Sequence, residues 1–173
     1  MEDEIVWKIA SLDVGSCLFW FVESKEERRL VMIPYLSQGV DRGEKLLVFG
    51  AKAFFQSNLA EEIRSRLGDK GLPATGQLNA FILNETDYGL RDVKGPEDLV
   101  TFMRSEMNRG LEEGYPAVRV LVEMDPIIQK CQNLPLLLEF EREIEELFSN
   151  SRCLGLMVLD TSRLEPGALA SLL

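Results

Sequence analysis

The stretch EEGYPAVRVLVEMD, residues 112–125, decides which fold the sequence predicts. Gly114 favours the end of a helix, and the Tyr-Pro pair that follows it prevents that helix from continuing. Residues 117–122 then form a mainly apolar, β-branched run, which is typical of a strand covered on both faces of a sheet. Glu123 and Asp125 come at its end, where open parallel sheets bind their ligands.

Outward from this strand, apolar runs and helical patterns alternate along the whole chain. Further strands are predicted for residues 17–22, 45–51, 77–83 and 153–159. Helices are predicted for residues 24–43, 58–67, 96–111, 136–149 and 165–173. Such alternation favours right-handed crossovers, so the expected fold class is three-layer α/β/α with a mostly parallel sheet, in a single domain spanning residues 1–173.

Local signals define some of the element ends. Ser24, three residues before Glu27, predicts a capping box at the start of the helix after the first strand. Pro34 inside that helix predicts a kink or two short helical pieces. In residues 1–14, apolar residues at every second position indicate a lead-in arm or a short strand.

The composition argues against several classes of function. A formal net charge of −10 repels phosphate backbones, so direct nucleic-acid binding is not expected. The chain has no histidine, which removes the commonest proton shuttle and the commonest transition-metal ligand. Cys17, Cys131 and Cys153 form no C-x-x-C pair, which favours buried free thiols. We therefore expect no metal, no cofactor and no catalysis.

The sequence also lacks the signals of membrane insertion and of phosphate binding. No apolar run could span a bilayer and the start MEDE is unlike a signal peptide, so a cytoplasmic protein without membrane contact is expected. The connection after the first strand, VESKEE (residues 22–27), has three carboxylates and no glycine, whereas a P-loop needs G-x-x-x-x-G-K-[ST]. Nucleotide binding is accordingly disfavoured.

Glu123 and Asp125 lie two residues apart and share one side of the strand if the strand continues. Such a pair could bind magnesium, act as acid and base, or hydrogen-bond a ligand. The structural alternative is that Glu123 caps a helix or pairs with an arginine such as Arg119, while Asp125 starts the next segment.

A few other residues are candidates on weaker signals. Phe54, Phe55 and Tyr88 fall in predicted loops, where they would line an apolar pocket or contact a partner, although core packing also explains aromatic residues. Glu139 could point into a cavity, whereas a solvated helix face is the simpler interpretation. Ser16 has no neighbouring base and therefore shows no sign of a catalytic role.

Four blocks of sequence occur in an order that resembles one known family. They are GSCLFWFVESKEERRLVMIPYLSQGVDRGEKLLVF (15–49), LEEGYPAVRVLVEMD (111–125), LLLEFEREIEELF (136–148) and LDTSRLEPGAL (159–169). They are similar to an aromatic-rich strand, an acidic loop, a proline-containing helix and a final D-x-x-R-x-x-P pattern of the MEDS sensory domain, the methanogen/methylotroph, dichloromethane-regulator type.

The resemblance implies a fold related to the RecA/KaiC type without a working P-loop. It also implies a sensory role toward small hydrocarbon derivatives, with signals passed to kinase or DNA-binding modules. Ser16 stands where the family usually has histidine, which puts any recognition by that histidine in doubt, and Trp20 stands where it usually has tyrosine. By position, Ser16, Trp20, Glu23, Glu123 and Glu139 join Phe54 and Phe55 as ligand-binding candidates.

Three functions follow as hypotheses. The first is a non-catalytic sensory domain that binds a small apolar or hydrocarbon-derived ligand at the carboxyl ends of the strands and signals to a partner protein or domain. The second is a protein-interaction module or homodimerisation domain that has lost its ligand. The third is a degenerate ATPase-like or metal-dependent enzyme that uses Glu123 and Asp125.

Overall fold

A five-stranded sheet forms the centre of the molecule in the computed structural model, which describes residues 2–69, 76–83, 94–130 and 134–163. Its strands are β1 (Cys17–Val22), β2 (Lys45–Ala51), β3 (Leu78–Leu83), β4 (Val118–Glu123) and β5 (Cys153–Asp160). They lie in the order β1-β5-β4-β2-β3, and all four pairings between neighbouring strands are parallel. All five strands therefore end at the same edge of the sheet.

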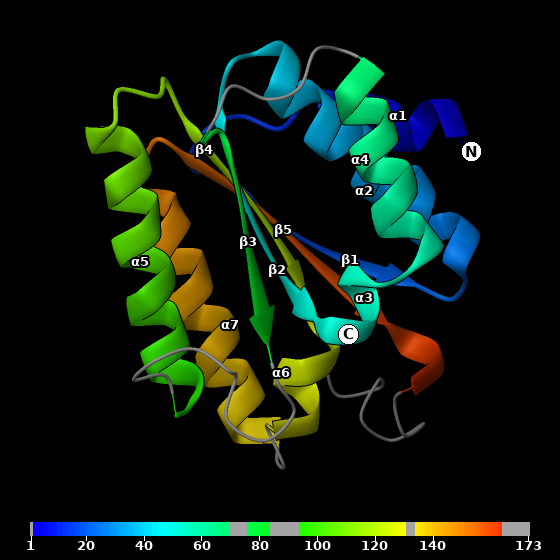
Figure 1. Ribbon diagram of the computed structural model, residues 1–173. Helices are drawn as coiled ribbons and strands as arrows, with labels where there is room; N and C mark the ends of the chain where they lie inside the picture. The colour runs from blue at the N-terminus through cyan, green and yellow to red at the C-terminus, as the bar shows by residue number, and fades with distance from the viewer. Residues whose placement is uncertain (1, 70–75, 84–93, 131–133, 164–173) are drawn as a thin grey trace.

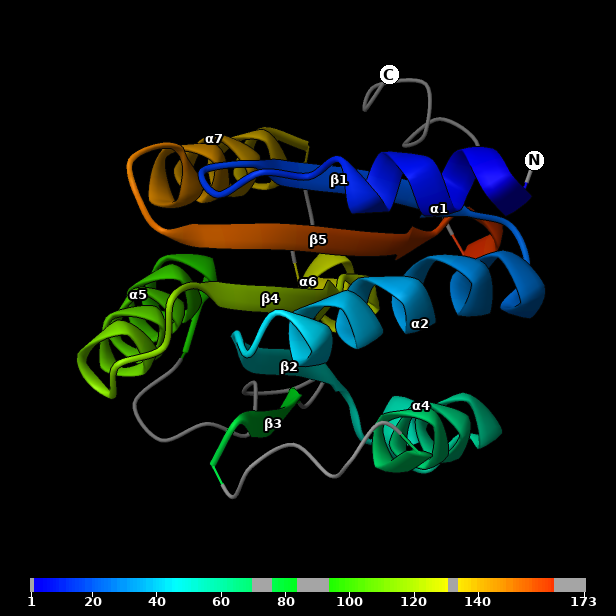
Figure 2. The ribbon, with the colours of Figure 1, turned by 90° about the horizontal axis from the view of Figure 1, so that it is seen from above.

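Helices cover both faces of this sheet (Figures 1 and 2). On one face lie α1 (Glu2–Ala10), α2 (Lys25–Asp41) and α4 (Asn58–Asp69), and on the other lie α5 (Pro96–Glu112) and α7 (Leu134–Ser149). The short elements α3 (Lys52–Phe55), α6 (Asp125–Lys130) and η1 (Thr161–Arg163) directly follow three of the strands. The predicted three-layer α/β/α class is confirmed, with a sheet that is parallel throughout the described residues.

Strand β4 shows why the sheet divides the core into two halves. Val118, Val120 and Val122 belong to the core under α5 and α7, whereas Leu121 belongs to the core under α1, α2 and α4. Alternate side chains of a strand point to opposite faces, so a strand apolar at nearly every position must be covered twice. The apolar run at residues 117–122, from which the fold was predicted, is therefore covered by helices on both faces of the sheet.

The prediction of a lead-in arm or a short strand in residues 1–14 is wrong, because Glu2–Ala10 forms helix α1. Ile5 and Ile9 lie four residues apart, which is one helical turn, and both are buried, while Trp7 between them is 68% exposed. The apolar residues of this segment fit the two-residue period of a strand as well as the roughly four-residue period of a helix. Packing against α2 stabilises the helix.

Helix α2 is continuous from Lys25 to Asp41 with Pro34 inside it, so it does not divide into two pieces as one of the predicted alternatives required. Buried side chains on both sides of Pro34, including Ile33, Tyr35 and Leu36, hold the helix against the sheet. Tertiary packing of this kind supplies most helix stability in proteins. The predicted closing helix at 165–173 lies outside the described residues.

A buried ion pair joins β4 to the residue before β2, and the same arginine also contacts α2. Arg119 on β4 is fully buried, and its Nε donates to Glu44 Oε2 at 2.5 Å. Its Nη1 donates to the carbonyl of Tyr35 at 3.1 Å, and its guanidinium stacks on the Tyr35 ring at 4.6 Å from the centroid. Gly39 makes room for this side chain, because a Cβ there would lie 2.9 Å from Arg119 Cδ.

Candidate functional site

A hollow of about 740 Å³ lies at the carboxyl ends of β2, β4 and β5, and we call it the rim hollow. It is lined by Lys25, Glu26, Arg28, Arg29, Ala51, Ala53, Phe54, Ser57, Asn58, Leu59, Glu62, Glu123, Asp125, Pro126, Gln129 and Asp160. Its size is within the range of small-molecule sites, about 300–1,000 Å³. It occupies the edge where parallel α/β sheets bind ligands.

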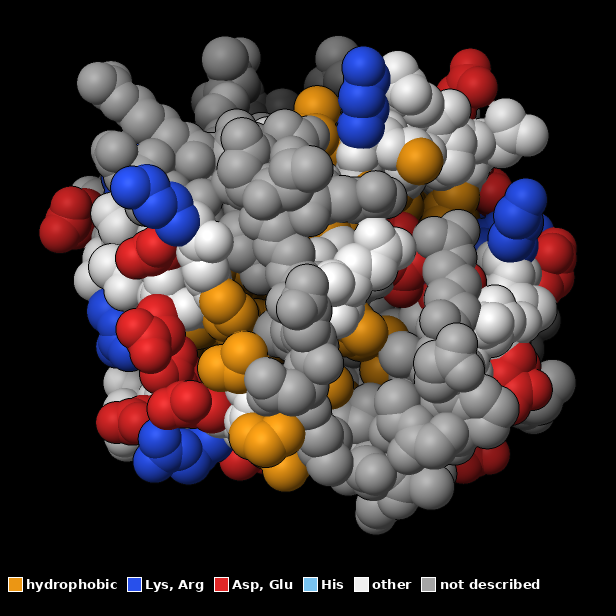
Figure 3. Space-filling model, turned by 90° about the horizontal axis from the view of Figure 1, so that it is seen from below, with side chains coloured by type: hydrophobic (Ala, Val, Ile, Leu, Met, Phe, Trp, Pro, Cys, Tyr) orange, Lys and Arg blue, Asp and Glu red, His pale blue; other side chains and the backbone are white. Residues whose placement is uncertain are grey.

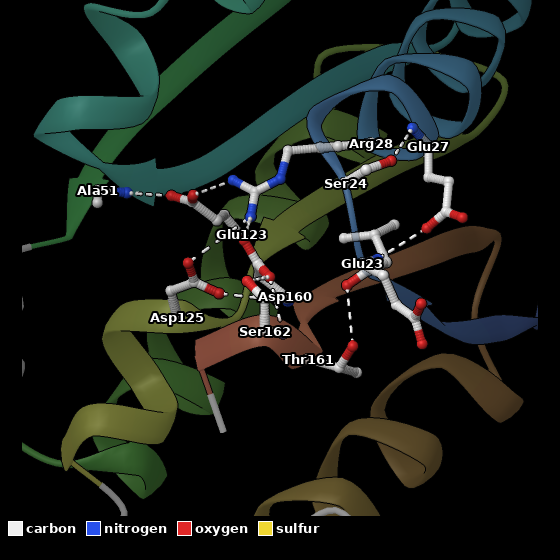
Figure 4. Close-up of polar contacts among 11 residues, drawn as sticks. Glu23, Ser24, Glu27, Arg28, Ala51, Glu123, Asp125, Asp160, Thr161 and Ser162 are labelled. Carbon is white, nitrogen blue, oxygen red and sulfur yellow. Dashed lines mark hydrogen bonds and ion pairs between the residues drawn. The ribbon is translucent and has the colours of Figure 1, made fainter. Parts of the chain in front are cut away.

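The start of α2 directs Arg28 into this hollow (Figure 4). Ser24 Oγ accepts a hydrogen bond from the backbone N–H of Glu27 at 3.2 Å, and Glu27 Oε2 accepts one from the backbone N–H of Glu23 at 2.7 Å. This pair of bonds is a variant of the predicted capping box: the bond to Ser24 Oγ is as predicted, whereas the Glu27 carboxylate accepts from Glu23, the residue before the N-cap, and not from Ser24. It fixes the first turn of the helix, and therefore the direction of the Arg28 side chain, over the strand ends.

The Arg28 guanidinium lies among three carboxylates, Glu123, Asp125 and Asp160, which we call the rim acids (Figure 4). Nη1 lies 2.7 Å from Glu123 Oε1, and Nη2 lies 3.1 Å from Asp160 Oδ2 and 3.7 Å from Asp125 Oδ2. Exposure of these four side chains ranges from 5% to 18%. One cation therefore serves three largely buried anions from the ends of two adjacent strands.

Each rim acid also has one oxygen held by the backbone. Glu123 Oε2 accepts from the N–H of Ala51 at 2.8 Å, and Asp125 Oδ1 accepts from the N–H of Asp160 at 3.4 Å. Asp160 Oδ1 accepts from the backbone N–H of Ser162 at 3.0 Å and from its hydroxyl at 2.5 Å. Each carboxylate is thus oriented through one oxygen and turns the other oxygen toward Arg28.

The Glu123 carboxyl is the rim acid with a displaced pKa. Burial raises its pKa above the ordinary 4.5, and the neighbouring Asp125 charge raises it further. The hydrogen bond from Ala51 and the Arg28 charge act in the opposite direction without cancelling the rise. Glu123 consequently takes up a proton more readily in the folded protein than in the unfolded chain.

This pKa gives a testable dependence of stability on pH. Because the folded pKa is the higher one, the stabilising contribution of Glu123 protonation is complete below about pH 4.5 and is lost as the pH rises through the folded pKa. We expect Glu123→Gln to remove this component from the wild-type curve of unfolding free energy against pH, measured by urea denaturation. Glu146→Gln, at an exposed position, controls for the loss of one negative charge. Parallel curves for wild type and Glu123→Gln would contradict the prediction.

Of the two candidate phenylalanines, Phe54 lines the rim hollow, whereas Phe55 packs against Phe54 and is not part of the lining. Phe54 lines the rim hollow and is 6% exposed, and its ring meets that of Phe55 edge-on at a centroid distance of 5.1 Å. A Cβ on Gly50 would lie 2.8 Å from Phe54 Cδ1 and 3.3 Å from Glu123 Oε2. Glycine at this position therefore allows the Phe54 ring and the Glu123 carboxylate to lie together. Tyr88, the third aromatic candidate, lies outside the described residues.

Three other candidates are placed away from the rim hollow's lining. Ser16 precedes β1 at the opposite edge of the sheet, where its carbonyl accepts from the N–H of Gly155. Trp20 lies within β1, packs against the core under α1 and α2, and has Lys8 Nζ 5.9 Å from its ring centroid. Glu23 is exposed, and its backbone N–H donates to Glu27 Oε2.

Glu139 belongs to a separate acidic cluster. Glu139 and Glu143 lie on α7, and Glu97 lies at the start of α5. Oxygens of the three carboxylates lie within 4.8 Å of one another, and all three residues line a hollow of about 160 Å³. In Figure 3, acidic and hydrophobic side chains lie side by side over the lower ends of α5 and α7. The cluster has a spacing that could hold a metal ion, but exposed acidic groups of this kind are common without one.

Two further predictions concern nucleophiles and phosphate. Burial, together with Glu145 and Glu141, raises the pKa of Cys17 to about 12, so its thiol stays protonated at neutral pH, and Cys17 and Cys153 are both free. Cys131 lies outside the described residues.

The connection between β1 and α2 consists only of Glu23 and Ser24. It is too short to form the glycine-rich loop that encloses phosphate.

Sequence reasoning identified Glu123 and considered Asp125, but it missed Arg28 and Asp160. Arg28 and Asp160 are 132 positions apart in the sequence, and Arg28 and Glu123 are 95 positions apart. One signal was available for Arg28, since the capping box at Ser24 fixes which residues of the first helical turn face the strand ends.

The sheet and its helices define a three-layer α/β/α domain with a parallel sheet, and the β1–α2 connection does not form a phosphate-binding loop. The family model described as MEDS, MEthanogen/methylotroph, DcmR Sensory domain, matches residues 18–173. The chain therefore belongs to the MEDS family of sensory domains. No curated protein matches it. Within the described residues, none of the helices combines the length and the apolar character needed to cross a membrane.

Proposed function

We propose that this domain is non-catalytic and senses a small, hydrocarbon-derived molecule that binds in the rim hollow. The observation that carries the proposal is the hollow itself, about 740 Å³ at the carboxyl ends of three parallel strands. Membership of a sensory domain family supports a binding role over a chemical one.

The lining of the hollow suits a molecule with one apolar part and one polar end. Phe54, Leu59 and Pro126 supply apolar surface, and Arg28 and the rim acids supply charged groups in the same lining. Burial of apolar surface contributes most of the binding free energy in such sites, and a few oriented polar groups fix the ligand's direction.

The rim acids also explain why we favour binding over catalysis. Each of the three carboxylates contacts Arg28 and holds a backbone N–H with its second oxygen. Such contacts orient the carboxylates and engage both oxygens of each one in ion pairs or hydrogen bonds, which suits holding a ligand in a fixed direction. The output would be a signalling partner, a kinase or a transcription module in a separate domain or protein, as the family resemblance implies.

A blocking variant tests the proposal. Ala53 is exposed on α3 and lines the rim hollow, so Ala53→Trp is expected to fill the hollow and leave the core unchanged. Lys52→Trp adds the same side chain at an exposed neighbour that does not line the hollow. A thermal-shift screen of small alcohols, amines, carboxylates and chloroalkanes should find compounds that stabilise wild type and Lys52→Trp but not Ala53→Trp. A ligand at a hundredfold excess over its Kd stabilises by about 2.7 kcal/mol. Compounds that stabilise all three proteins equally would place the site elsewhere.

A further inference from the structure

Building on the proposed function, we infer that the ligand of the rim hollow carries a positively charged nitrogen, so that it belongs to the alkylammonium or alkylguanidinium class. The inference rests on that function and adds the charge of the ligand. Three separate features of the hollow support it: its charge balance, the orientation of the rim acids, and the spacing of their oxygens.

The charge balance of the hollow is negative. Its lining holds three basic side chains, Lys25, Arg28 and Arg29, and five acidic ones, Glu26, Glu62, Glu123, Asp125 and Asp160, a formal excess of two negative charges. Arg29 is already engaged by Glu62 at 2.6 Å. The excess negative charge would repel an anionic ligand at close range in this partly desolvated site, whereas a cationic ligand would offset that charge.

The orientation of the rim acids is that of a receptor for a cation. Backbone N–H groups of Ala51, Asp160 and Ser162 each hold one oxygen of a rim acid, and the other oxygen faces the position of the Arg28 guanidinium. Carboxylates fixed in this way need little rearrangement to accept hydrogen bonds from a second cation. Arg28 shows which kind of group this geometry accepts, since it is itself an organic cation.

The spacing favours an organic cation over a metal ion. Throughout the described part of the chain, the one trio of acidic groups close enough to hold a metal ion is Glu97, Glu139 and Glu143 on another surface. The rim acids are spread around a planar guanidinium instead. Carboxylates arranged in this way suit nitrogen donors that point in several directions, with the hydrocarbon part of the ligand lying against Phe54 and Leu59.

Three probes that share one hydrocarbon chain test the inference: n-pentylammonium, n-pentanol and n-pentanoate, titrated at constant ionic strength by calorimetry. We expect n-pentylammonium to bind wild type more tightly than n-pentanol, and n-pentanoate to bind most weakly. Asp160→Asn removes the charge of the most exposed rim acid and is expected to weaken n-pentylammonium binding roughly threefold to fivefold, with n-pentanol unaffected. Glu146→Gln, on an exposed face of α7, should bind all three probes as wild type does.

Each outcome decides the inference. Preference for the ammonium probe, lost in Asp160→Asn and in Ala53→Trp, supports it. Equal or tighter binding of n-pentanol or n-pentanoate in the rim hollow overturns the charge assignment and leaves the proposed function standing. Binding of none of the three probes, or binding unaffected by Ala53→Trp, overturns the charge assignment together with the proposed site. Stabilisation by Mg²⁺ that Asp160→Asn abolishes would overturn it in favour of a metal ion.

Discussion

Replacing Arg119 with methionine is expected to lower the free energy of unfolding by about 3–5 kcal/mol, because the buried Glu44 carboxylate loses its close guanidinium partner and keeps only the half-exposed Arg42, at 4.0 Å. Arg119 has no exposed side-chain surface and Glu44 has 5%. The substitution also removes the hydrogen bond to the Tyr35 carbonyl and the stacking on the Tyr35 ring. Urea denaturation followed by circular dichroism measures the loss, and methionine preserves most of the volume.

Two further variants separate the buried charge from simple loss of packing. Arg119→Met combined with Glu44→Gln should recover part of the stability, because no buried charge then lacks a partner. Arg66→Met breaks a mostly exposed pair with Glu62 on α4 and should leave the unfolding midpoint close to that of wild type. If the double variant is no more stable than Arg119→Met alone, the loss does not come from the buried charge of Glu44.

The fold could be predicted from the sequence because its strands carry a strong and unambiguous signal. A parallel sheet buried on both faces needs runs that are apolar on both sides, and residues 117–122 and 153–159 have this pattern. Helix α1 could not be predicted in the same way. Its apolar residues, Ile5, Trp7 and Ile9, fit two periods, and the decision between them comes from packing on α2, which is not visible in the local sequence.

The site was only partly predictable, because it depends on the order of the strands. Glu123 was identified from its place at a strand end, and the structure confirms an arginine partner while correcting which arginine it is. Arg119 lies four residues before Glu123 on the same strand, which separates them by about 13 Å at the usual rise. That distance is too long for an ion pair. Arg28 reaches Glu123 because α2 starts at the same edge of the sheet where β4 ends.

The pairing of Arg119 with Glu44 shows the same limit. Glu44 stands just before β2, and β2 lies next to β4 in the sheet. Their contact is therefore a consequence of strand order, and no local spacing in the sequence indicates it. Predictions from one sequence are strongest for elements and weakest for partners, because the paired residues here are separated by 75 to 132 positions in the sequence.

Replacing Arg28 with alanine is expected to have the second large effect, a loss of about 3 kcal/mol in the free energy of unfolding at neutral pH. The variant removes the one guanidinium that all three rim acids face, while their backbone hydrogen bonds still hold them together. Arg28 is 12% exposed and Glu123 is 5% exposed, so water can screen the remaining repulsion only in part. Arg29→Ala, on the same helical turn, removes a more exposed cation and should cost less.

The pH dependence of this loss distinguishes charge repulsion from lost packing. Arg28 lowers the pKa of Glu123, so its removal moves that pKa further above the ordinary value. Protonation of Glu123 then relieves the repulsion. The stability deficit of Arg28→Ala relative to wild type should consequently be largest well above the folded pKa and should shrink as the pH falls through it. Denaturation curves of both proteins at neutral pH and near pH 5 measure this change. A deficit of the same size at both pH values would mean that Arg28 acts through its packing and not through its charge.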